Sequence, residues 1–320
     1  MKILGIDSSG MTASVALAAD DILMAEFTIN NKRTHSETLL PMIDKMLDTV
    51  GVEPSELTAV AIASGPGSFT GLRIGAATAK GLALALDIPV VAVPTLEGLA
   101  YNLAGDKRLI VSVMDARRNE VYAGAYNVKL KDSDIIKTIS SEQEESESDF
   151  PTNSAAKENR NDSQANTAGD DIKNDSPVNS VSDENMNDSP VNSSVDENMA
   201  SGVSAIANGA ADENAAYTVI ETVIQETALP VNELLDKLEE LGREVIFVGD
   251  GIAVVKNALS ERELRVPFSF APVHSERQRG ASIALLGKLY FEAGRGMVSD
   301  DFAPEYLRKS QAERVKDEMK

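Results

Sequence analysis

Ser64-Gly-Pro-Gly-Ser-Phe-Thr-Gly-Leu-Arg73 is the stretch that decides the fold of this 320-residue chain. It follows the apolar run 57–63, which predicts a buried strand, and it opens the small-residue run 71–86, which predicts a helix. Its glycines permit close backbone approaches that a Cβ would prevent, and Ser68 and Thr70 are suitable N-cap residues. A strand, a glycine loop and a helix in this order indicate an α/β fold.

A glycine loop at a helix N-terminus is a common anion site, so this loop was compared with two phosphate-binding patterns. Thr70 comes five residues after Gly65, where a P-loop would begin its Gly-Lys-Ser/Thr. Thr70 also takes the place of the last glycine of the Rossmann pattern. We therefore interpret the glycines as packing residues at the start of the helix and keep anion binding as the weaker alternative.

The formal net charge of −21 is concentrated in one segment. Residues 140–214 hold 17 acids and 3 bases, so they carry −14 and the remaining chain carries −7. Residues 140–216 are rich in Asn, Ser, Asp and Glu and contain a polar tandem repeat, 174–186 and 187–199, which predicts a disordered acidic insertion. The mild acidity of the rest argues against a chain that holds nucleic acid by itself.

The residue types present limit which metal sites and which cellular compartment we expect. There is no cysteine, and His35 and His274 are the two histidines, so we expect no metal site and no cofactor. His35, beside a predicted helix start, is expected to cap or pack. No run of eighteen apolar residues occurs, and residues 1–7 resemble a strand rather than a signal peptide, so we expect a cytoplasmic protein without a membrane span.

Hydrophobic periodicity divides the rest into two similar halves. Each half opens with strand hairpins and continues with helix–strand units, which indicates a duplicated α/β architecture. The predicted subdomains are 1–105 and 106–320, the second interrupted by 140–216. In the first half, strands are predicted at 2–6, 13–18, 22–29, 57–64 and 89–93, and helices at 36–50, 71–86 and 95–103. In the second, strands are predicted at 109–114, 120–126, 217–226 and 244–248, and helices at 232–241 and 275–293.

This layout resembles the actin, Hsp70 and sugar-kinase superfamily (ASKHA, ribonuclease-H-like), whose members bind nucleotide between the halves. The resemblance implies a degenerate nucleotide site built from acid-bearing turns and a glycine turn. Its residues are Asp7, Ser8, Ser9, Asp115, Gly249, Asp250 and Gly251.

Four stretches together resemble the bacterial TsaB (YeaZ) family. They are Met1-Lys-Ile-Leu-Gly-Ile-Asp-Ser-Ser9, Thr34-His-Ser-Glu-Thr-Leu-Leu-Pro41, Ser64–Arg73 and Pro304-Glu-Tyr-Leu-Arg308. The resemblance covers residues 1–128 and 217–310. It implies a scaffold subunit without chemistry of its own, which pairs with the catalytic paralogue TsaD. With the ATPase TsaE, that complex transfers threonylcarbamoyl to N6 of adenosine 37 in tRNAs that read ANN codons.

The resemblance also implies which residues lack or carry a role. The paralogue's two metal-binding histidines fall at Thr95 and Leu99 here, so we assign no catalytic residue and no metal ligand. The partner is expected to meet the helices 36–50 and 71–86, and tRNA to bind only through the complex. The predicted interface residues are Leu39, Leu40, Ile43, Met46, Leu47, Gly71, Leu72, Gly75, Ala76, Ala79 and Ala83.

Four alternatives stay open. The stripe Gly71–Ala83 could instead be buried within one domain, and the isolated chain could form a homodimer through the same face. A stand-alone ATPase or kinase would use the Asp7 and Asp115 turns with magnesium. A metallopeptidase would require stoichiometric metal.

Overall fold

The computed structural model describes residues 1–31, 34–131, 203–204 and 217–308. Within the predicted acidic insertion, the described residues are Val203–Ser204, which form the short strand β8 and pair with Ile220 and Glu221. The rest of the disorder prediction and the whole tandem repeat lie outside the described residues.

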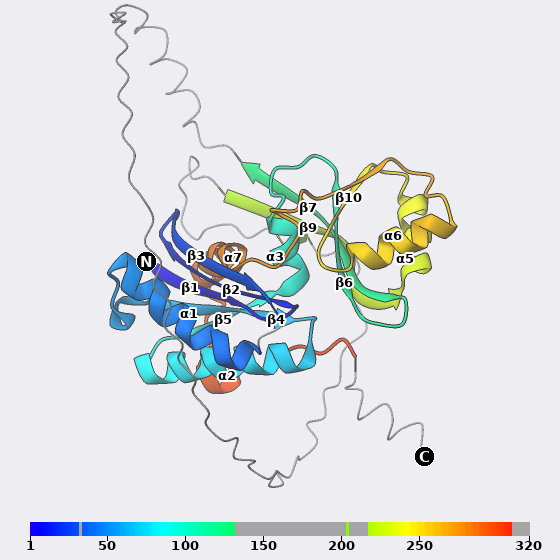
Figure 1. Ribbon diagram of the computed structural model, residues 1–320. Coiled ribbons are helices and arrows are strands. Elements are labelled where there is room, and N and C mark those ends of the chain that lie inside the picture. Colours follow the sequence, from blue (N-terminus) through cyan, green and yellow to red (C-terminus); the bar gives the residue numbers. More distant parts are fainter. Residues whose placement is uncertain (32–33, 132–202, 205–216, 309–320) are drawn as a thin grey trace, which may run out of the picture. The chain divides into compact units, whose positions relative to one another are not determined.

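The first sheet confirms the predicted hairpin start. Its strands are β1 Lys2–Asp7, β2 Thr12–Ala19, β3 Ile22–Asn30, β4 Ala59–Gly65 and β5 Val90–Pro94. They lie in the order β3-β2-β1-β4-β5 (Figure 1). β1, β2 and β3 pair antiparallel, whereas β4 and β5 continue the sheet parallel to β1.

The second sheet repeats this topology. Its longer strands are β6 Leu109–Asp115, β7 Glu120–Lys131, β9 Tyr217–Pro230, β10 Val245–Val248 and β11 Phe268–Phe270. The order β11-β10-β6-β7-β9-β8, followed from β9, matches the first sheet strand for strand. The hairpins β6-β7 and β7-β9 are again antiparallel, and β10 and β11 are parallel to β6. Two sheets of the same order and direction fit the predicted duplication.

Helices cover the sheets because successive strand residues point to opposite faces. The helices are α1 His35–Val50, α2 Phe69–Leu86, α3 Thr95–Tyr101, α5 Val231–Leu241, α6 Ile252–Glu261 and α7 Gly280–Glu292, with short 3-10 turns at Pro54–Glu56 and Ser299–Asp301. In β1, Leu4 and Ile6 share a core with α1 and α2. Gly5 faces the other way, where a Cβ would meet the backbone of α7.

Another hydrophobic core joins the two halves. It brings α3 and α7 together with residues of both sheets, among them Val91 and Val93 from β5 and Ile110 and Met114 from β6. α5 and α6 cover the other face of the second sheet (Figure 1). α7 lies within the range 106–320 but packs on β1, β2 and β4. The boundary at residue 105 stays a prediction, because the two halves share this helix.

No helix of the described part of the chain has the length and apolar character needed to cross a membrane.

Candidate functional site

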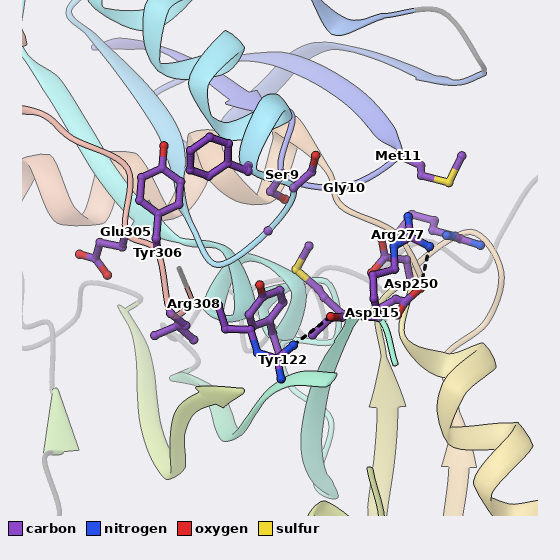
Figure 2. A pocket seen from close by; sticks show the side chains of 17 residues that line it. Ser9, Gly10, Met11, Asp115, Tyr122, Asp250, Arg277, Glu305, Tyr306 and Arg308 are labelled. Carbon is purple, nitrogen blue, oxygen red and sulfur yellow. Dashed lines mark hydrogen bonds and ion pairs between the residues drawn. The ribbon is translucent and has the colours of Figure 1, made fainter. Parts of the chain in front are cut away.

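A polar pocket of about 380 Å³ lies where the first and second sheets meet. Figure 2 shows it bordered by the turn that carries Ser9 and Met11, by Asp115 at the end of β6, and by Asp250 with Arg277. Of the seven residues predicted for a nucleotide site, Ser9, Asp115 and Asp250 line this pocket. Asp7, Ser8, Gly249 and Gly251 are not among its lining residues.

The turn after β1 is held by its own side chains. Asp7 is buried, and its Oδ1 accepts hydrogen bonds from the Ser9 backbone N–H at 2.9 Å and the Ser9 hydroxyl at 2.6 Å. Burial raises the pKa of Asp7 to about 7, although the two bonds from Ser9 oppose this shift. The Ser8 hydroxyl donates to the Gly71 carbonyl at 2.8 Å. The turn therefore anchors α2 and leaves little free hydrogen-bonding capacity for a phosphate.

The turn after β6 is strained. Arg117, Arg118 and Asn119 all have positive φ, between 57° and 67°, which residues with a side chain seldom adopt. Asp115 stabilises the turn by accepting from the Arg117 N–H at 2.7 Å and pairing with its guanidinium at 3.2 Å. The Arg117 side chain is otherwise exposed at the rim of the pocket.

The glycine turn after β10 packs on the backbone of β6. Gly249 has a φ of +116°, and a Cβ there would collide with the Val113 carbonyl. Gly251 donates from its N–H to that same carbonyl at 3.0 Å. Asp250, between them, is half-buried, and its buried Oδ1 has no hydrogen-bond partner among the described residues. Burial raises the pKa of Asp250, while the Arg277 charge lowers it.

Polar groups of the glycine loop form hydrogen bonds within the fold. Gly65 N–H donates to Thr95 Oγ1 at 3.2 Å, and Ser68 N–H donates to the Ser9 carbonyl at 2.6 Å. Ser68 Oγ caps α2 by accepting from Gly71 N–H at 3.3 Å. These contacts support the packing interpretation of the loop over the anion-binding one.

The C-terminal segment was missed as part of this pocket. Glu305, Tyr306, Leu307 and Arg308 line it (Figure 2), and Arg308 donates to the Ala116 carbonyl at 3.1 Å and pairs with Glu120. The sequence offered one signal, because these residues belong to a stretch that resembles the TsaB family. That signal did not show where the stretch lies in the fold.

The predicted partner interface needs correction. All but one of its residues are buried in this chain, on the faces of α1 and α2 that contact the first sheet. Ala79 has no exposed surface, and a Cβ on Gly75 would meet the Ser8 hydroxyl and Ile62. Small residues recur there because α2 lies close to the β1 turn. The exception is Leu40, which is 55% exposed.

The outer faces of the same two helices are open. Leu40 and Leu47 line a groove of about 300 Å³ formed by α1 and the segment 52–57, to which α2 contributes Leu82. Asp44 and Asp48 also line this groove. A second small-residue stripe, Ala77, Gly81 and Ala85, is exposed on α2. A Cβ on Gly81 would meet no atom within 4 Å. An approaching chain could contact these residues without any change in the core.

Thr95 and Leu99, where the resemblance predicts that the paralogue's metal ligands fall, serve packing. Thr95 is fully buried, and its hydroxyl accepts from Gly65; Leu99 belongs to the shared core. Among the described residues, no group of three or more His, Asp or Glu side chains could hold a metal ion. His35 Nε2 lies 2.9 Å from the Gly10 carbonyl, in a packing role, and His274 is exposed.

Comparisons with known proteins agree with this geometry. A family model described as "TsaD: tRNA N6-adenosine threonylcarbamoyltransferase" matches residues 23–140. Two relatives carry the name "tRNA threonylcarbamoyladenosine biosynthesis protein TsaB": one from Bacillus subtilis is 43% identical over 129 residues, and one from Escherichia coli is 40% identical over 129 residues. The two matches cover 40% and 39% of this chain and 56% and 55% of the relatives.

The solved structure "YeaZ from Pseudomonas aeruginosa" is similar in fold, with a TM-score of 0.57 and 20% identity over 96% of this chain and 99% of that chain. The repeated sheets and the pocket between them define an α/β protein of the duplicated, actin-like class. Within that class, the matched part of the chain is similar in sequence to relatives named TsaB. The chain spans about half the length of the curated relatives that it matches.

Proposed function

We propose that this chain is a non-catalytic scaffold subunit of the tRNA threonylcarbamoyladenosine system. It would pair with a TsaD-like catalytic subunit and work with a TsaE-like ATPase, and tRNA would bind only through the complex. The names of its relatives point to this pathway. The observation that carries the proposal is the open apolar face of α1 and α2, built on a chain whose Thr95 and Leu99 serve packing.

The interface proposed after correction is the outer face of the two helices. It comprises Leu40 and the groove beside it, together with Ala77, Gly81 and Ala85. Small residues allow another helix to approach closely, and an apolar centre is what stable interfaces bury. A contact of this type would bury on the order of 1,600 Å² in total.

Gly81 offers a test that separates binding from folding. Gly81→Gln places a long neutral side chain into open space on α2, so the fold should gain about 0.5–1 kcal/mol from the loss of a helical glycine. Binding to a TsaD-type subunit of the same organism should weaken at least about tenfold, which corresponds to 1.4 kcal/mol. Isothermal titration calorimetry or sedimentation measures both the affinity and any self-association of the free chain.

Two controls sharpen this test. Gly81→Ala gives the same gain in helix propensity with a much smaller side chain, so it should bind nearly normally. Ala253→Gln adds the same side chain at an exposed position of α6 in the second half. Equal affinity of Gly81→Gln, Ala253→Gln and the wild type would contradict the interface. Ala79→Glu is unsuitable, because it would bury a carboxylate in the core that α1 and α2 share with the first sheet.

The ATPase alternative has its own measurement. The loop contacts described above use the Ser68 and Gly65 N–H groups internally, and Asp7 is tied to Ser9. We therefore expect the purified chain alone to show no magnesium-dependent ATP turnover. Sustained turnover that is lost in Asp115→Asn would favour the enzyme instead.

A further inference from the structure

The segment 297–308, called here the C-terminal strap, runs from the edge of the first sheet to the turn after β6. It starts at Met297, whose backbone pairs with Val90 of β5 through two bonds of 2.9 Å. Phe302 is buried in the core beneath α1 and α2. At its described end, Arg308 reaches the second sheet.

Both charged residues of α2 hold this strap. Lys80 Nζ donates to the carbonyls of Asp300 at 3.3 Å and Phe302 at 3.1 Å. Arg73 Nε donates to Tyr306 Oη at 3.3 Å, and its guanidinium lies 4.0 Å from the centre of the Phe69 ring. The two charged side chains of this otherwise apolar helix therefore both contact the strap.

The strap then closes on the glycine loop. The Phe69 and Tyr306 rings lie 4.8 Å apart, and Glu305 N–H donates to the Ser64 carbonyl at 2.7 Å. Gly65 has a φ of +130°, and a Cβ there would collide with the Glu305 carbonyl, so a glycine is required under the strap.

Beyond the loop, Arg308 crosses to the strained turn. Its guanidinium donates to the Ala116 carbonyl and pairs with Glu120, and so it grips both sides of the turn 116–120. Figure 2 shows Tyr306 and Arg308 on the same side of the pocket. This turn, with three residues at positive φ, lies outside the shared core and is held by its own hydrogen bonds, by Asp115 and by Arg308.

We propose that the strap links α2 mechanically to the pocket. Arg308 sets the position of the turn 116–120, and a partner that docks on α2 shifts this turn through Arg73, Tyr306 and Arg308. The partner arm of this inference rests on the proposed function, whereas the positioning of the turn by the strap does not.

Spin labels measure the link directly, because the chain has no cysteine of its own. Met11→Cys and Arg118→Cys place labels at exposed positions on opposite sides of the pocket. In the labelled protein with a wild-type strap, double electron–electron resonance should give one narrow distribution of distances between the two labels. Arg308→Ala and Tyr306→Ala should broaden it and move it to longer distances, whereas Leu307→Ala, at an exposed neighbour, should not.

Hydrogen exchange on the unlabelled chain supplies a second readout. The Ala116 and Glu120 amides, which bond within the turn, should exchange about tenfold faster in Arg308→Ala, while β1 and β4 stay protected. Tyr306→Phe, which loses only the hydroxyl, serves if a harsher variant fails to fold. Unchanged distances and unchanged exchange in both strap variants would overturn the positioning role.

The partner arm adds a TsaD-type subunit to the labelled protein. Binding should shift the label distance in the wild-type strap and leave it unshifted in Arg308→Ala. Binding without any shift would overturn the link from α2 to the pocket. Absence of binding would contradict the proposed function alone, because the strap variants are compared without a partner.

Discussion

Two half-buried glutamates show how single residues set the response of this chain to pH. Glu226 on β9 accepts a 2.8 Å hydrogen bond from the Tyr126 hydroxyl, and Glu97 on α3 accepts one from Tyr290. Burial raises the pKa of Glu226 to about 8, and the nearby Glu97 adds to the rise. Neither residue was predicted from sequence, because an isolated Glu in a strand or helix pattern gives no sign of burial.

The raised pKa makes stability depend on pH. The folded chain binds the Glu226 proton more tightly than the unfolded chain, whose pKa is near 4.5. The contribution of Glu226 to the unfolding free energy is therefore full below about 4.5 and lost as the pH rises to about 8. Glu226→Gln should remove this loss, because the amide oxygen still accepts from Tyr126.

Chemical denaturation measures the unfolding free energy of both proteins between about pH 5 and 9, a range that includes the pKa of about 8. Relative to the wild type, Glu226→Gln should gain about 1 kcal/mol or more at the alkaline end. Glu221→Gln makes the same change of charge on the same strand, at a side chain that bonds to Asn127 and not to Tyr126, and is the matched control. Asp7 leaves part of the slope in every variant, since its pKa is raised to about 7. A parallel pH profile for Glu226→Gln would contradict the assignment.

Gly249 tests whether the glycine turn is structural. Gly249→Ala combines a positive φ with a collision against the Val113 carbonyl, so it should cost about 2–4 kcal/mol of unfolding free energy. Gly242→Ala is the matched control: its φ is also positive, +61°, but a Cβ there meets no atom within 4 Å. It should cost only about 1 kcal/mol. Similar losses for the two variants in urea titrations would remove the collision from the explanation.

At the scale of elements, the sequence predicted strands and helices well where period and end signals agreed. The helix predicted at 36–50 is His35–Val50, and the strand predicted at 57–64 is Ala59–Gly65. The burial of α2 was misjudged for a physical reason: small residues are needed both where a helix packs on its own chain and where it meets another. The pattern of Gly71 to Ala83 could not separate these cases, and α6 was missed because its ten residues follow a glycine turn.

Ser68 gives a prediction for α2 itself. Its hydroxyl caps the helix by accepting from Gly71 N–H, so Ser68→Ala should lower the unfolding free energy by about 1 kcal/mol. Thr34 occupies the N-cap of α1 without a side-chain capping bond, so Thr34→Ala should cost less. Thermal melts of both variants test the difference, and an equal loss would show that the Ser68 bond contributes nothing.

For the whole molecule, the duplicated order of strands followed from repeated hairpin and helix–strand patterns, whereas the sharing of α7 between the halves did not. Its apolar residues gave no direction, because a helix buried on both sides has no polar face to orient it. The strap could not be predicted because its contacts join residues far apart in the sequence, 188 positions for Glu120 and Arg308 and 233 positions for Arg73 and Tyr306.

Removal of residues 140–214 should leave this architecture intact. Lys131 at the end of β7 pairs directly with Tyr217 at the start of β9, so a short connection can close the hairpin. The deletion also removes β8, a two-residue edge strand, at small cost. We expect the midpoint of thermal unfolding to change by only a few degrees. A loss of cooperative unfolding would mean that the deleted segment stabilises the second sheet.

The central claim, a scaffold subunit that acts through the outer face of α2, is tested most directly in a strain depleted of its own TsaB. The threonylcarbamoyladenosine content of tRNA, measured by mass spectrometry of its nucleosides, reports the function. The account predicts that the wild-type chain and Ala253→Gln restore the modification, whereas Gly81→Gln, although folded, does not. Failure of the wild-type chain to restore it, or full restoration by Gly81→Gln, would contradict the account.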